Sequence, residues 1–166
     1  MKSIFFVICI FILKCCVVQN TDVFEGYKVS GSVSLDQKKF IRLRHLDTIN
    51  SLRLENNLNK LKLSPFLNAS ADTHARDIFY QKRAWNFGSD LSSPYERGKV
   101  SKFPGKIIGE NVSETFEGEF EVLQVWLNNK LSSENIFNPN ATHLGLGIYQ
   151  EENGKIWWVQ DIGTAD

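Results

Sequence analysis

Residues 143–162, with the sequence HLGLGIYQEENGKIWWVQDI, contain the clearest strand pattern in the chain. In the first half, large apolar residues alternate with Gly145 and Gly147, and these glycines would let a helix approach the backbone closely. The dipeptide Asn153-Gly154 then predicts a tight type I′ turn. Residues 155–162 return as a strand that is apolar on both faces, so both faces need cover. We therefore expect an α+β fold: a three-layer α-β-α sandwich with a small, mainly antiparallel sheet between helices.

Two helices are expected before this hairpin. Residues 40–56 carry apolar side chains at helical spacing, and Asn57 is a residue type that tolerates a left-handed helix end. Ser64-Pro65 is a typical helix start, with a capping hydroxyl followed by proline at the first helical position. The spacing after it predicts a helix to about Arg83.

The segment between these helices and the hairpin is less regular. Ser93-Pro94 predicts a short helical turn, and a further helix is expected after Thr115 or Gly118. Residues 130–141 are interpreted as a polar connection. The stripe expected to be buried in the third helix consists of Phe120, Leu123, Trp126 and Leu127.

Length and composition limit the class of protein. The chain has 166 residues, which is enough for one domain with a real core. It has 19 basic and 19 acidic residues, and the resulting net charge of zero argues against a nucleic-acid partner. Its three cysteines, Cys9, Cys15 and Cys16, all precede residue 19, so the rest of the chain offers no disulfide and no thiol nucleophile.

The N-terminus has the pattern of a targeting segment. Lys2 precedes an apolar run of ten residues, Ile4 to Leu13, which suits a signal peptide and is too short to span a bilayer. We expect a signal peptide at 1–18, a linker at 19–39, a domain from residue 40 to 166, and no membrane span in the mature form. The expected location is secreted, extracellular or periplasmic. A lipid anchor at Cys16 and an uncleaved leader are alternatives.

The run Ile107-Ile108-Gly109-Glu110-Asn111-Val112 places one carboxylate between apolar residues. Glu110 is either a solvated turn residue or a carboxylate directed into a pocket, where it would need donors or a cation. Two other polar residues, His74 and His45, lie on apolar helix faces. Both are interpreted as core histidines that donate to a backbone carbonyl. Sequons for N-glycosylation occur at Asn68, Asn111 and Asn140.

Residues 46–163 together resemble the CAP superfamily (cysteine-rich secretory proteins, antigen 5 and pathogenesis-related proteins) in its compact, cysteine-free bacterial-type form. The resemblance begins with the helical pattern around Asn50 and Arg53 and continues through Gly109-Glu110-Asn111-Val112. It ends with Trp126, then Asn135-Ile136-Phe137-Asn138-Pro139, and then Leu144-Gly145-Leu146-Gly147. No single piece is specific, but five pieces in the right order and spacing are. Asn111, Trp126, His74, Gly145 and Gly147 would then be structural residues.

The resemblance implies a cleft in which two histidines and one or two glutamates can hold a divalent transition metal. In this sequence Asn86 and Ser132 stand at the two histidine positions, and Asn129 stands at the second acidic position. Only Glu110 remains, so we expect no metal and no cofactor, and a cleft formed by Asn86, Glu110, Asn129 and Ser132. No histidine lies between His74 and His143, so a replacement would have to come from His143.

Three functions are compatible with this sequence. The first is a secreted, non-enzymatic binding module with a degenerate cleft, no catalytic residue, and a lipid or sterol, peptide or protein ligand. The second is a metal-dependent or peptide-hydrolysing enzyme that uses Glu110 with His143 or another partner. The third is an extracellular structural or interaction protein. Whether the chain is an enzyme stays open, with the binding module preferred.

Overall fold

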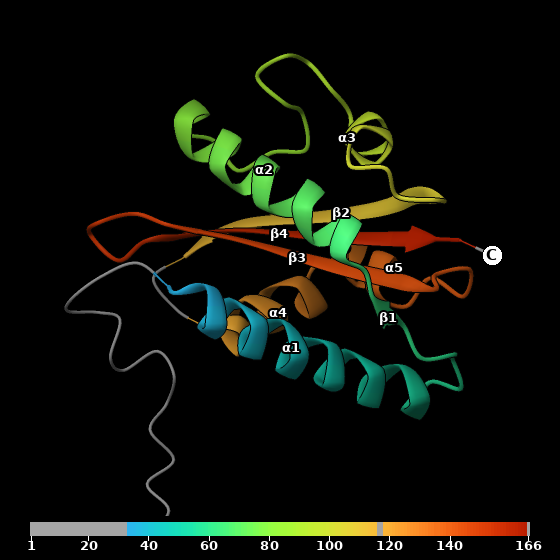
Figure 1. Ribbon diagram of the computed structural model, residues 1–166. Helices are drawn as coiled ribbons and strands as arrows, with labels where there is room; N and C mark the ends of the chain where they lie inside the picture. Colours follow the sequence, from blue (N-terminus) through green and yellow to red (C-terminus); the bar gives the residue numbers. More distant parts are fainter. Residues whose placement is uncertain (1–32, 116–117, 166) are drawn as a thin grey trace, which may run out of the picture.

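A mixed sheet lies between two layers of helices in the computed structural model, which describes residues 33–115 and 118–165. Helices α2 and α3 cover one face, and α1 and α4 cover the other (Figure 1). The elements are α1 (Leu35–Glu55), β1 (Lys62–Leu63), α2 (Pro65–Gln81), α3 (Pro94–Val100), β2 (Lys106–Thr115), α4 (Glu119–Asn128), α5 (Lys130–Ile136), β3 (His143–Gln150) and β4 (Ile156–Thr164). The expected α-β-α sandwich is confirmed.

The four strands lie in the order β1-β3-β4-β2. Strand β1 runs parallel to β3, while β2 and β3 both pair antiparallel with β4. Strand β4 is therefore central, and its apolar side chains enter separate cores on the two faces. Ile156 and Trp158 pack toward α1 and α4, whereas Trp157 and Val159 pack toward α2. The prediction that this strand is covered on both sides is confirmed.

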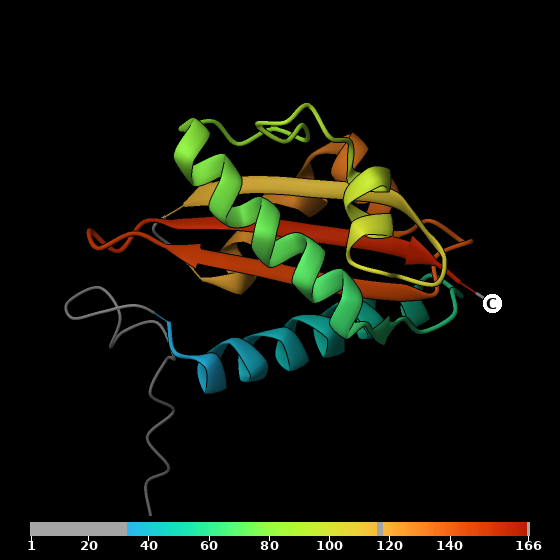
Figure 2. The same cartoon turned by 45° about the horizontal axis from the view of Figure 1, so that its top comes forward.

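Two glycines of β3 allow α2 to cross the sheet at close range (Figure 2). A Cβ atom at Gly145 would lie closer than 3.0 Å to the backbone of Leu67, and one at Gly147 would lie equally close to the backbone of Ala71. Real Cβ atoms do not approach backbone this closely, so any larger residue would push the helix away. The expected close approach is confirmed.

The hairpin turn differs from the type I′ prediction. Gly154 has φ of 91°, but Asn153 is not among the residues with positive φ, as a type I′ turn would require. Gly154 N–H donates to the carbonyl of Glu151 at 2.9 Å, and Glu151 N–H donates to the carbonyl of Lys155 at 2.8 Å. This pattern is a type I turn followed by a left-handed glycine, which adds one residue to the loop.

The first helix begins five residues before the expected start. Ser34 caps α1, and its hydroxyl accepts from Gln37 N–H while the Gln37 side chain accepts from Ser34 N–H. This capping box stabilises the start of the helix, although residues 35–39 are largely polar. The predicted left-handed conformation of Asn57 is confirmed by its φ of 57°. Helix α2 begins at Pro65 as predicted, with Ser64 as its cap.

In residues 118–141 the structure differs from two of the expectations from sequence. In α4, Phe120 is half exposed and Val122 is buried in its place. The expected polar connection contains α5, because the Asn129 side chain accepts from Ser132 N–H and caps a short helix there.

Residues 1–32, which include the expected signal peptide, the possible anchor Cys16 and most of the expected linker, lie outside the described residues. Within the described part, none of the helices combines the length and the apolar character that crossing a bilayer would require.

Candidate functional site

Glu110 lies in the middle of β2 and directs its side chain toward α2 and α3. The side chain is 1% exposed, so its charge needs partners inside the protein. The Arg97 guanidinium donates to Oε2 at 2.6 Å, and the Asn86 amide donates to Oε1 at 3.0 Å. Glu110 is therefore a buried carboxylate with a cationic partner and an amide partner, and it is not a solvated turn residue.

Arg97 is held in place by the chain around it. Ser93 and Glu96 form a capping box that starts α3, and Arg97 follows directly after Glu96. Its guanidinium also donates to the carbonyls of Ser92 at 2.7 Å and Asn86 at 3.1 Å. One side chain thus joins the loop after α2 to the central carboxylate of the sheet.

His74 on α2 is the histidine that faces Glu110. Its ring is fully buried, and Nε2 donates to the carbonyl of Trp85 at 2.9 Å, the arrangement expected from the sequence. The same nitrogen lies 3.7 Å from Glu110 Oε1. Burial lowers the pKa of His74, although the charge of Glu110 opposes the shift. The ring is therefore neutral at neutral pH, and Nδ1 is an acceptor.

Asp161 is part of this cluster and was missed in the sequence. It stands directly opposite Glu110 in the β2–β4 ladder, and it is fully buried. Neither of its carboxylate oxygens has a hydrogen-bond donor in the described structure. Burial, and then the charge of Glu110, raise the pKa of Asp161 well above its usual value, while Ser70 and Arg97 lower it. The raised pKa favours the protonated form of Asp161, beside the Glu110 carboxylate.

Replacing Asp161 with asparagine should stabilise the protein above about pH 6, by about 1–3 kcal/mol. The folded state keeps a proton that the unfolded state loses above pH 3.8, so the wild-type protein loses stability as pH rises toward the folded pKa. An asparagine amide can donate to Glu110 without holding a proton. Urea unfolding of both proteins from about pH 4.5 to about pH 8 measures the difference. A difference that stays constant over this range would contradict the shared proton.

The other two expected cleft residues lie elsewhere. Asn129 is exposed and caps α5 by accepting from Ser132 N–H. The carbonyl of Ser132 accepts from the Asn111 amide at 3.1 Å, on the face of the sheet opposite to the Glu110 side chain. The structure therefore brings Asn86 and Glu110 together, and it places Asn129 and Ser132 at the junction of α4 and α5.

Asn111 and Gln160 form a separate polar network on that opposite face. Asn111 donates to Gln160 Oε1 at 2.9 Å and accepts from Asn135 at 2.8 Å. The Gln160 amide in turn donates to His45 Nε2 at 2.7 Å. His45 is buried as expected, but its partner is this side-chain amide and not a backbone carbonyl. Asn135 also fixes α5 against the edge of β2, where it donates to the carbonyl of Glu110 at 3.4 Å.

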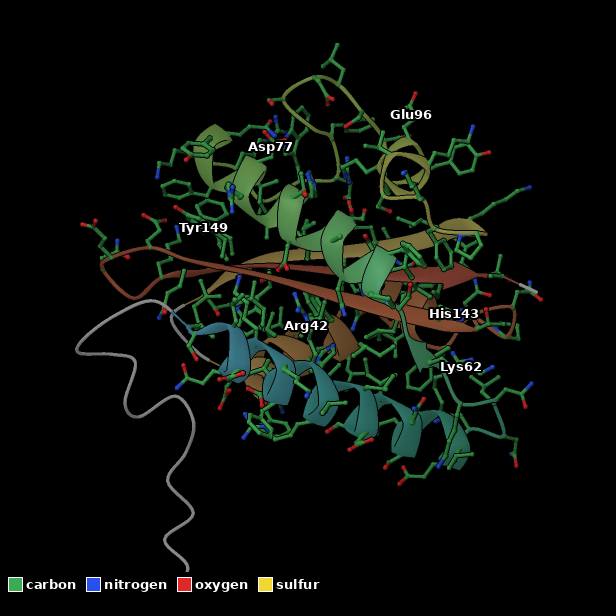
Figure 3. All side chains as sticks on the ribbon, in the orientation of Figure 1. Arg42, Lys62, Asp77, Glu96, His143 and Tyr149 are labelled. Carbon is green, nitrogen blue, oxygen red and sulfur yellow. The ribbon has the colours of Figure 1, made fainter. Side chains whose placement is uncertain are left out.

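His143 does not face Glu110. It pairs with Lys62 at the β1 end of the sheet, as Figure 3 shows, and its ring packs against Phe103. The ladder places it two strands away from Glu110 and two residues further along, roughly 12 Å between Cα atoms. The suggested replacement of a cleft histidine by His143 is therefore wrong.

A pocket of about 480 Å³ opens between α2, α3 and the loop 89–92. Its lining includes Ser70, His74, Asp77, Asp90, Arg97 and Val100. Glu110 lies behind this wall, in contact with two of the side chains that form it, His74 and Arg97. Glu110 thus positions pocket residues without being exposed to the pocket itself.

Comparison with known proteins shows the family of the chain. The sequence profile of the family described as CAP, the Cysteine-rich secretory protein family, matches residues 46–162. The chain belongs to the CAP family. The matched region runs from the middle of α1 to two residues before the end of β4, and so contains Glu110, Arg97, His74 and Asp161.

Similar proteins include one curated relative and several solved structures. The chain is 31% identical over 133 residues to YkwD of Bacillus subtilis (strain 168), covering 80% of this chain and 49% of YkwD. An extracellular protein containing a SCP domain from Bacillus anthracis str. Ames is 24% identical, with a TM-score of 0.67 over 82% of this chain and 45% of that protein. An outer surface protein from Borrelia burgdorferi is 17% identical, with a TM-score of 0.71 over 82% of this chain and 98% of that protein. The chain spans about half the length of the two Bacillus proteins.

The residues around Glu110 do not fit the transition metal that the CAP resemblance implies. Asn86 offers an amide where an imidazole would be needed, and His74 Nε2 already donates to Trp85. The guanidinium of Arg97 bonds to the carboxylate that would bind the ion. Across residues 33–115 and 118–165, no three His, Cys, Asp or Glu side chains are grouped in a way that could hold a metal.

Proposed function

We propose that this CAP domain is an extracellular, non-enzymatic binding module whose ligand site is the pocket between α2 and α3. The observation that carries the proposal is the buried ion pair of Arg97 and Glu110. It neutralises the carboxylate and uses it to hold the pocket wall in place. This ion pair competes with metal binding and makes the carboxylate a weaker base toward a ligand.

Acid–base chemistry has little support in the same cluster. Asp161 has no exposed surface, and Glu110 is almost fully buried, so neither carboxyl group can touch a ligand without a rearrangement. The His74 ring has one nitrogen committed to Trp85. An enzyme that uses Glu110 with His74 as its partner remains the alternative, and the experiment below distinguishes the two.

The proposed location rests on two facts. The relatives from Bacillus anthracis and Borrelia burgdorferi are described as an extracellular protein and an outer surface protein. Lys2 is followed by the short apolar run Ile4 to Leu13, a pattern typical of a signal peptide. Detection of the protein in culture medium or on intact cells by immunoblotting tests this location.

Zinc and calcium should leave the melting temperature unchanged within about 1 °C, because Arg97 competes for the Glu110 carboxylate. A metal bound with a Kd of about 10 µM and added at about 1 mM would instead raise the melting temperature by about 5–10 °C. A thermal-shift titration measures this directly.

Glu110→Gln is the matched test variant, and Glu114→Gln is the control on the same strand, since Glu114 pairs with Lys155 away from the cluster. A zinc stabilisation of several degrees that is lost only in Glu110→Gln would overturn the proposal in favour of the metal-dependent enzyme. Cleavage of a peptide library by the wild-type protein, but not by Glu110→Gln, would overturn it as well.

A further inference from the structure

Helix α1 has an outward stripe that none of the described elements covers (Figure 1). Its inward stripe consists of Ile41, His45 and Ile49, all of them buried. The opposite stripe carries Phe40, which is 61% exposed, and Leu43, which is 40% exposed. Exposed apolar side chains that are scattered singly are ordinary, but two that lie three residues apart on a helix are neighbours on its surface. The outer face of α1 is therefore apolar at this point.

Phe120 enlarges this apolar area from the neighbouring helix. It lies at the start of α4 and is 50% exposed. The Arg44 guanidinium lies 5.7 Å from the centre of the Phe120 ring, and it forms an ion pair with Glu119, the residue before Phe120. Because Arg44 follows Phe40 by one turn of α1, it brings both phenylalanine rings to the same surface. Phe40, Leu43 and Phe120 together form what we call the α1–α4 patch.

Charged residues flank this patch in a pattern that is complementary to itself. Lys39 lies four residues before Leu43 and Asp47 lies four residues after it, and both side chains are exposed. The ion pairs in the described part of the chain include neither of them. They lie about 12 Å apart along the helix, too far to pair within one copy. In two antiparallel α1 helices related by a two-fold axis at Leu43, Lys39 of each copy comes level with Asp47 of the other.

We propose that two copies of this chain associate through the α1–α4 patch as an antiparallel dimer. This inference goes beyond the proposed function and does not depend on it. The two-fold axis places Phe40 and Leu43 of both copies at the centre, with Phe120 beside them and the two Lys39–Asp47 pairs at the margin. The charges select a second copy as the partner, because each copy carries both halves of the pair. A contact of this kind is closed, so it gives a dimer and not a fibre.

The size of the patch limits the strength of the dimer. Helix α1 has 21 residues, and α4 has ten. A helix of that length is about 30 Å long, and stable complexes bury about 800 Å² on each partner. Three half-exposed apolar side chains per copy supply only part of such an area. We therefore expect a weak, reversible dimer with a Kd on the order of 100 µM.

Dimerisation through α1 leaves the candidate ligand site open. The pocket of about 480 Å³ lies between α2 and α3, in the helical layer on the other side of the sheet (Figure 2). Each copy in the dimer therefore keeps an accessible pocket, and the dimer is a bivalent form of the module. Loss of the dimer should lower the avidity for a multivalent ligand without changing the affinity of a single pocket. Failure of either proposal thus leaves the other standing.

Sedimentation-velocity centrifugation of the purified full chain from about 10 µM to about 1 mM tests the inference. The average mass should rise with concentration from that of a monomer toward that of a dimer. Phe40→Glu places a charge at the centre of the interface and should weaken the dimer at least about tenfold. Tyr80→Glu is the matched control, because Tyr80 is an exposed aromatic residue of α2 on the other side of the sheet. It should change the Kd less than about twofold.

A charge exchange tests the register of the two helices. Lys39→Glu and Asp47→Lys each place like charges opposite one another in both pairs, and each should weaken the dimer about five- to tenfold. The double variant restores opposite charges in both pairs, so its Kd should return to within about twofold of that of the wild type. Circular dichroism of each variant checks that the fold is intact.

Four results would overturn the inference. The first is a chain that stays monomeric at about 1 mM. The second is a dimer that Phe40→Glu leaves unchanged, because the interface would then lie elsewhere. The third is a series of larger assemblies that grow with concentration, because the contact would then be open. The fourth is a double variant as weak as Lys39→Glu alone, because the antiparallel arrangement about Leu43 would then be wrong.

Discussion

Replacing Arg53 with methionine should lower the free energy of unfolding by about 3–5 kcal/mol. Arg53 is fully buried on α1, and its guanidinium donates to four backbone carbonyls. The acceptors are Asn59 at 2.9 Å, Ile136 at 2.7 Å, Asn138 at 3.1 Å and Ala141 at 3.4 Å. Methionine fills similar space but removes the guanidinium donor from all four carbonyls, of which Asn138 still accepts from Ala141 N–H. Each buried group left unsatisfied costs about 1–3 kcal/mol.

Urea denaturation followed by circular dichroism measures this loss, provided that the m-value is unchanged. Arg76→Met on the exposed side of α2 is the control, and it should change stability by no more than about 0.5 kcal/mol. Arg53→Lys should be intermediate, because an ammonium has three donors and cannot reach all four carbonyls. Equal losses for Arg53→Met and Arg76→Met would show that the four hydrogen bonds contribute nothing.

The α-β-α sandwich could be predicted because the apolar pattern of β4 by itself requires cover on both faces of the sheet. A strand with Ile156 and Trp158 on one face and Trp157 and Val159 on the other has only one good environment, between two helical layers. The two glycines of β3 also predict a helix packed closely on the sheet, because α2 occupies the space that their missing side chains leave. Both signals lie within a few residues of one another in the sequence.

The cluster around Glu110 could be predicted only in part. Asn86 was found because its spacing from the surrounding residues resembles a family motif, and its amide does bond to Glu110. Asp161 could not be found in this way, because its relation to Glu110 depends on the register of two strands that are far apart in the sequence. A single acidic residue in an otherwise apolar strand was the available signal.

The contacts of His74 and Arg97 with Glu110 could not be predicted either, because the three residues lie apart in the sequence. His74 was expected to be a core residue, and it does donate to a backbone carbonyl, but it also faces Glu110. Arg97 follows a proline start in a helix of only seven residues, so no periodic pattern marks its buried face. Helix α5 was missed for the same reason, because its polar sequence depends on the cap at Asn129 and on packing against β2.

Acidification from pH 6.5 to about pH 4 should remove about 3 kcal/mol of stability through His45 alone. Burial lowers the pKa of His45 from 6.5 to about 3, so between these values the unfolded chain binds a proton that the folded chain does not. Stability is therefore lost as pH falls. Gln160 reinforces the neutral ring, because its amide donates to Nε2 and would clash electrostatically with a second N–H there.

The pH dependence of the whole protein does not isolate this effect, because Asp161 titrates in the opposite sense and His74 in the same sense. The measured quantity is therefore the difference in unfolding free energy between wild type and His45→Gln, whose amide oxygen can still accept from Gln160. That difference should fall by about 1.4 kcal/mol per pH unit below pH 6.5. His143→Gln is the control, because this ring lies near the surface and has a less buried environment, so its difference curve should be much shallower. Parallel curves for the two variants would mean that His45 is protonated in the folded state and that the Gln160 amide does not hold the ring neutral.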